Sequence, residues 1–111
     1  MERSFRWATA EGNGVEHFAL GITLQGVLAE GVVIGPDSGG AYEGSLYGCS
    51  YTIRCDARWR VWQVEVRVAG GAVLLLRADG EGRWSGPDGA PLPVLDGCID
   101  VDLTCTPFTN T

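Results

Sequence analysis

The stretch that decides the fold is WRVWQVEVRVAGGAVLLLRADG, residues 59–80. Its residues alternate in character with a period of two, which is typical of a β-strand. One predicted face carries Arg60, Trp62, Val64, Val66 and Val68, and the other carries Trp59, Gln63, Glu65 and Arg67. Gly70 and Gly71 separate this run from a second β-rich run and predict a two-residue turn, because glycine accepts positive φ. The stretch therefore predicts an antiparallel hairpin.

The same alternation recurs along most of the chain, and no segment shows a helical period. Predicted strands cover Val15 to Leu24, Val27 to Ile34, Tyr42 to Cys55 and Ile99 to Thr106, with a short one at Arg83 to Ser85. In the first of these, Phe18, Leu20, Ile22 and Leu24 are predicted to face the core. Glycine-rich turns separate the strands. We expect a single all-β domain over residues 1–111, with seven or eight strands in an antiparallel meander curled into a partial roll or barrel-like sheet.

Composition excludes several classes of function. The net charge is −6, and the eight basic residues are arginines scattered singly along the chain. Because phosphate binding needs clustered cations, we expect no nucleic-acid partner. The longest apolar run, Ala72 to Leu76, is too short to insert into a membrane. The N-terminus lacks the apolar segment of a signal peptide, so we expect a cytoplasmic protein.

The four cysteines favour reduced thiols over a disulfide or metal site. Cys49 and Cys55 fall on one face of one predicted strand but about 20 Å apart, which is beyond disulfide reach. No CxxC motif is present, and His17 is the single histidine. We interpret the cysteines as small buried hydrophobic residues and expect neither a metal nor a cofactor.

Asp100 and Asp102 share one side of the last predicted strand, and Asp96 lies at its entry. These carboxylates could form a solvated surface, a cation or acid/base site, or a buried face. In the last case they need a cationic partner, because unpaired buried charge is very costly, and Arg60 is the candidate. Trp62 and the other large aromatic residues either belong to the core or line a concave sheet that holds an apolar or sugar-bearing ligand.

An enzyme is the alternative reading. His17 has Glu16 beside it, but neighbouring residues of a strand point to opposite faces, so the two cannot act as a simple pair. No GxSxG or phosphate-binding motif is present. A hydrolase or isomerase would therefore use His17 with an aspartate that folding brings near.

The C-terminal sequence LDGCIDVDLTCTPFTNT, residues 95–111, resembles the bacterial family named putative glycolipid-binding proteins. Shorter elements of the resemblance are Glu16-His17, the segment from Gly31 to Gly35, Tyr51-x-Ile-x-Cys-Asp, Trp59-Arg60 and Pro91-Leu92-Pro93. The resemblance implies a spiral β-roll wound around one helix, a dimeric tendency and a glycolipid or lipid-like ligand. We therefore expect a non-catalytic binding module with Tyr51 and Trp62 as apolar contacts and Arg60, Asp100 and Asp102 as polar contacts.

The chain differs from the family in one respect, because family members continue past TPFTNT into further strands. We expect the chain to lack those C-terminal strands and to carry an open sheet edge. Such an edge invites pairing with another chain, which predicts a homodimer or edge-mediated self-association. A structural dimerising domain is therefore a third reading.

Overall fold

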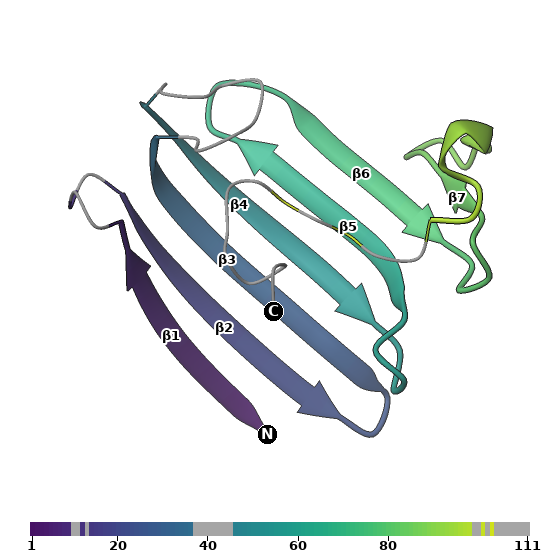
Figure 1. The fold of residues 1–111 in the computed structure, drawn as a ribbon, viewed down its shortest axis with the longest axis horizontal. Coiled ribbons are helices and arrows are strands. Elements are labelled where there is room, and N and C mark those ends of the chain that lie inside the picture. Colours follow the sequence, from purple (N-terminus) through teal and green to yellow (C-terminus); the bar gives the residue numbers. More distant parts are fainter. Residues whose placement is uncertain (10–11, 13, 37–45, 99–100, 102, 104–111) are drawn as a thin grey trace.

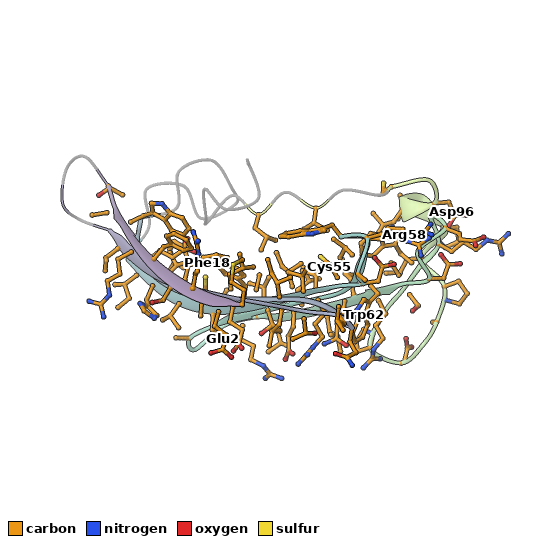
Figure 2. All side chains as sticks on the ribbon, turned by 90° about the horizontal axis from the view of Figure 1, so that it is seen from below. Glu2, Phe18, Cys55, Arg58, Trp62 and Asp96 are labelled. Atoms are coloured by element: carbon orange, nitrogen blue, oxygen red, sulfur yellow. The ribbon has the colours of Figure 1, made fainter. Side chains whose placement is uncertain are left out.

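The structure is a computed structural model that describes residues 1–9, 12, 14–36, 46–98, 101 and 103. In this part of the chain, seven strands form one sheet in which each strand pairs antiparallel with the next (Figure 1). The elements are β1 (Glu2–Ala8), β2 (Val15–Thr23), β3 (Gly26–Pro36), β4 (Leu46–Cys55), β5 (Val61–Val68), β6 (Val73–Ala78), β7 (Trp84–Ser85) and the 3₁₀ turn η1 (Pro93–Leu95). The sheet curls without closing into a barrel (Figure 2). The predicted all-β meander is confirmed.

Side-chain alternation in β2, β3 and β4 matches the sequence pattern. Phe18 is buried whereas His17 is exposed, and Tyr51 and Ile53 are both buried in β4. The prediction for one core residue was wrong. Leu24 is 94% exposed, because β2 ends at Thr23 and Leu24 lies in the turn that leads to β3.

β1 was not predicted, although its pattern is visible in the sequence. It pairs with β2 from Glu2 opposite Gly21 to Ala8 opposite Val15. Phe5 and Trp7 alternate with polar residues and contact Phe18 of β2. The Phe5 ring stacks on the Phe18 ring with centroids 6.1 Å apart, and the Trp7 ring is tilted against it with centroids 5.4 Å apart. Aromatic contacts between neighbouring strands stabilise a sheet, so this cluster attaches β1 to the core.

The hairpin of β5 and β6 forms as predicted, but its turn is longer. Val68 N–H donates to the Ala72 carbonyl at 3.0 Å, which leaves Ala69, Gly70 and Gly71 in the turn instead of two glycines. Gly70 has the positive φ, 71°. The turn thus still depends on glycine, but at one position.

The first part of β5 departs from the predicted faces. The β4–β5 register shifts between Arg54 and Cys55, so that Cys55 is opposite Val61 while Arg54 is opposite Gln63. Val61 consequently packs against the core. Trp62 is 43% exposed. The expectation that Trp62 continues the row of Val64, Val66 and Val68 was wrong, because a bulge interrupts the alternation.

Two segments predicted as strand fall largely outside the described residues, namely 42–45 and 99–106. Within the second, Val101 and Leu103 are described, and neither belongs to a strand. Both pack against the buried core. A hydrogen bond from Trp84 Nε1 to the Cys98 carbonyl at 2.8 Å fixes the chain just before them. The chain after η1 therefore returns over one face of the sheet.

The turn between β4 and β5 is organised by Asp56. Its Oδ1 accepts the backbone N–H groups of Arg58 and Arg60, each at 2.9 Å. Its Oδ2 accepts Nε of Arg60 at 2.7 Å. These donors favour the ionised carboxylate and hold the pKa of Asp56 below its ordinary value of 3.8, with the Arg60 backbone N–H as the largest cause.

This turn should make folding stability depend on pH. Because the pKa of Asp56 is lower in the folded chain than in the unfolded chain, the carboxylate stabilises the fold above pH 3.8. That contribution is lost as the pH falls through the folded-state pKa. We expect Asp56→Asn to lower the urea midpoint at neutral pH and the difference from the wild type to shrink in acid. A difference that stays constant across this range would contradict the assignment.

Candidate ligand-binding face

The sheet has two chemically different faces. Figure 2 shows the curved sheet from its side, with Phe18 and Cys55 on the hollow side and Glu2 on the other. We call the hollow side the inner face; its buried core residues are Phe18, Val27, Ala29, Val33, Cys49, Tyr51, Ile53, Cys55, Val64 and Trp84. The opposite side is the outer face, which carries His17, Ser50 and Arg67. The inner face is therefore the apolar one.

One row of residues crosses the inner face from β1 to β6. In strand order the row is Phe5, Phe18, Gly31, Tyr51, Val66 and Leu74, each directly opposite the next. Phe18 and Tyr51, in the middle, are each 2% exposed. Phe5 and Leu74, at the two ends, are 41% and 47% exposed. The chain thus covers the centre of the hollow and leaves apolar side chains accessible at both ends.

A polar pair lies within this apolar face. The Tyr51 hydroxyl donates a hydrogen bond to Oε2 of Glu16, a residue only 3% exposed. Tyr51 belongs to β4 and Glu16 to β2, so the phenol must reach across β3. It crosses at Gly31, where a Cβ atom would overlap the Tyr51 ring. Glycine at this position is therefore required by the close approach of the ring.

The polar pair was not identified as a site from the sequence. Glu16 occupies an inward position of β2, because Glu16, Phe18, Leu20 and Ile22 share a face. A carboxylate at the end of an apolar face was the signal that could have revealed it, since a buried charge needs compensating hydrogen bonds.

Among the described residues, the predicted site residues Tyr51, Arg60 and Trp62 lie in different surroundings. Tyr51 lies on the inner face but is too deeply buried for direct contact with a ligand in this structure. Arg60 pairs with Asp56, and its side chain is 53% exposed. Trp62 lies at the bulge of β5, outside the core cluster. Asp100 and Asp102 lie outside the described residues, so their predicted pairing with Arg60 stays a prediction.

The outer face has a shallow hollow of about 390 Å³ over β2, β3, β4 and β5. Its side chains are His17, Ala19, Glu30, Val32, Ser50, Thr52, Glu65 and Arg67. Nδ1 of His17 accepts a hydrogen bond from Nε of Arg6 at 3.2 Å, and Arg67 Nε donates to Glu65 Oε1 at 2.6 Å. Among the described residues, the carboxylates that share this hollow with His17 belong to Glu30 and Glu65.

Three further observations concern the described residues alone. No three histidine, cysteine, aspartate or glutamate side chains among them lie close enough together to hold a metal ion. Cys49 and Cys55 are buried as predicted, whereas Cys98 is exposed, contrary to the expectation of a buried thiol. A helix with the length and apolarity to cross a bilayer is also absent from this part of the chain.

Comparison with known proteins connects this fold to a family. The family model described as "Putative glycolipid-binding" matches residues 4–111. The chain belongs to this family. This chain is 32% identical in sequence to a DUF1089 family protein from Pseudomonas aeruginosa, and its structure resembles the crystal structure of that protein with a TM-score of 0.64. The alignment covers 95% of this chain and 54% of that one, so this chain spans about half of its length. A search of curated proteins finds no significant match.

The Tyr51 crossing should make Gly31 intolerant of any side chain. Gly31→Ala places a methyl group against the phenol ring, and we expect it to destabilise the fold by about 1–3 kcal/mol in urea denaturation. Gly21→Ala is the matched control, since its Cβ would meet nothing closer than the Leu28 carbonyl at 4.0 Å. The control should be neutral or slightly stabilising. Equal destabilisation by both substitutions would show that the crossing is not the cause.

The hydrogen bond of the pair should be measurable by a double-mutant cycle. Tyr51→Phe removes the hydroxyl that serves the buried carboxylate, and we expect a loss of about 1–3 kcal/mol. In a Glu16→Leu background the same substitution should cost clearly less, because the carboxylate is gone. Additive effects of the two substitutions on the free energy of unfolding would contradict coupling between these side chains.

Proposed function

We propose that the inner face binds the acyl part of a glycolipid or similar lipid-like molecule without catalysis. Support comes from the family, whose name denotes glycolipid binding, and from the apolar row that ends in exposed side chains. Phe5 and Leu74 together offer accessible apolar surface at opposite sides of the hollow. Exposed apolar surface of this kind marks sites for ligands or partners.

The observation that carries the proposal is the distribution of exposure along the row. Val101 and Leu103 pack against the core, while Phe5 and Leu74 keep more than a third of their surface accessible. An acyl chain at these positions would remove apolar surface from water and gain about 25 cal/mol per Å². A polar headgroup would then lie at the rim, and contacts from Arg60, Asp100 and Asp102 remain part of the proposal.

Adjacent residues of β6 give a controlled test, because they point to opposite faces. Leu74→Asp puts a charge on the inner face, and Val73→Asp puts the same charge on the outer face at a residue 57% exposed. We expect the protein purified from bacteria to carry a stoichiometric lipid in native mass spectrometry. Leu74→Asp should reduce this lipid at least about tenfold, since an acyl chain cannot solvate a carboxylate, whereas Val73→Asp should retain it.

The chemical identity of the lipid follows from organic extraction of the same samples. A glycolipid or another molecule with an acyl chain supports the proposal. An empty protein that binds no member of a panel of glycolipids and phospholipids would overturn it. So would an equal loss of lipid in both variants, provided that circular dichroism shows both to be folded.

A further inference from the structure

The turn between β4 and β5 has an unusual residue at its tip. Among the described residues, Trp59 is the one residue other than glycine with a positive φ, 65°. A residue with a Cβ atom is strained in this left-handed conformation. The Trp59 side chain is also 51% exposed, and it does not belong to the core cluster. Trp59 is therefore unfavourable for the backbone and adds little to the packing of the core.

Two other turns of the described chain have the same closing hydrogen bond and use glycine at the equivalent position. In each turn a backbone N–H donates to the carbonyl four residues later. The donors and acceptors are Asp56 and Arg60, Asp79 and Arg83, and Gly86 and Ala90, at 2.9, 3.0 and 3.0 Å. The last residues of the three loops are Trp59, Gly82 and Gly89, with φ of 65°, 89° and 81°. Glycine suits this position best, so the turn does not need the tryptophan.

The turn between β2 and β3 lies beside this turn, at the same end of the sheet (Figure 1). The two strands that leave these turns are paired there, with Val27 opposite Cys55. Leu24, at the tip of the β2–β3 turn, is 94% exposed, and Trp62, just after the β4–β5 turn, is 43% exposed. We call the surface formed by Leu24, Trp59 and Trp62 the turn surface. It concentrates large apolar side chains in water at one end of the sheet.

Positive charge accompanies the turn surface. Arg58 and Arg60 are both exposed, and Figure 2 shows Arg58 and Trp62 at the same end of the sheet. The Asp56 carboxylate accepts three hydrogen bonds within the turn, from the backbone of both arginines and from Nε of Arg60. The Arg58 side chain forms no ion pair with any described residue. The tip of this turn thus presents a cation, although the net charge of the chain is −6.

We propose that the turn surface docks on the headgroup layer of a phospholipid bilayer. Tryptophan rings favour the membrane interface, an exposed leucine gains by entering it, and arginine attracts lipid phosphate. The bilayer is chosen as the partner on the basis of the proposed function, because a protein that holds an acyl lipid must exchange it with a membrane. The contact is peripheral, since it uses single side chains of two turns.

The turn surface adjoins one end of the inner face. Cys55 is directly opposite Val27 on β3 and Val61 on β5. Val27 and Cys55 are buried core residues, and Val61 packs against them as part of the same cluster. The apolar inner face therefore continues up to the two turns. Docking through these turns would bring that face close to the bilayer and shorten the path of an acyl chain through water.

Vesicle flotation with the full chain tests the docking, using vesicles of phosphatidylethanolamine and phosphatidylglycerol. We expect the wild type to float with these vesicles. Trp59→Gly should weaken the binding at least about tenfold, because it removes the largest apolar side chain of the turn surface. The same substitution should leave the urea midpoint unchanged or raise it, because glycine adopts the left-handed conformation without strain. A clear fall in the midpoint would show that Trp59 serves the fold instead.

Two further substitutions separate the apolar and the charged contributions. Leu24→Ser should weaken vesicle binding at least about fivefold. Ile34→Ser is its matched control, because Ile34 is 60% exposed but lies near the opposite end of β3, and it should bind as the wild type does. Arg58→Gln should weaken binding to the anionic vesicles about fivefold and have little effect on vesicles of phosphatidylcholine alone.

The proposal is overturned by a wild type that does not float, by a Trp59→Gly variant that floats as well as the wild type, or by equal losses in Leu24→Ser and Ile34→Ser. Native mass spectrometry of the same samples reports separately on the proposed function. A wild type that carries lipid but does not float overturns the docking alone. A wild type that is empty but floats through Trp59 and Leu24 supports the docking and contradicts the ligand on the inner face.

Discussion

The structure depends on one contact that joins three strands. The Tyr51 side chain of β4 lies over β3 at Gly31 and reaches the buried carboxylate of Glu16 on β2. A phenol can cross a strand only where that strand has no side chain on the same face, so the contact fixes which residue of β3 lies between the two partners. A shift of one residue would bring Val32 or Glu30 to that position and would turn the apolar residues of β3 outward.

The meander provides the scaffold for this contact. Because every strand pairs with its neighbour in sequence, each pairing closes only a short stretch of chain and costs little chain entropy. The curvature then places the apolar residues of many strands around one hollow. Val101 and Leu103 close the middle of that hollow, while its two sides keep accessible apolar surface.

The family supports the proposed class of ligand, whereas the geometry of the sheet supports the proposed binding surface. The family model assigns the chain to the family, and the crystal structure of the DUF1089 protein resembles it in fold with a TM-score of 0.64. Two of the residues selected from the sequence as ligand contacts have other partners in the structure, since Tyr51 is buried and Arg60 pairs with Asp56. The apolar row, which includes Phe5 and Leu74, is a better guide to the proposed binding surface, because it rests on strand pairing instead of residue type.

The sequence alone specifies the all-β class, the hairpin of β5 and β6 and the inward face of β2 as far as Ile22, because alternation and turn glycines act between near neighbours. It also contained the pattern of β1, Phe5 and Trp7 alternating with Ser4 and Arg6, but a single short segment is ambiguous without its partner strand. The tertiary structure alone decided the bulge that displaced Trp62, the return of Val101 and Leu103 over the inner face, and the meeting of Tyr51 with Glu16. Tyr51 and Glu16 are 35 residues apart, and only the register and curvature of the folded sheet bring them together.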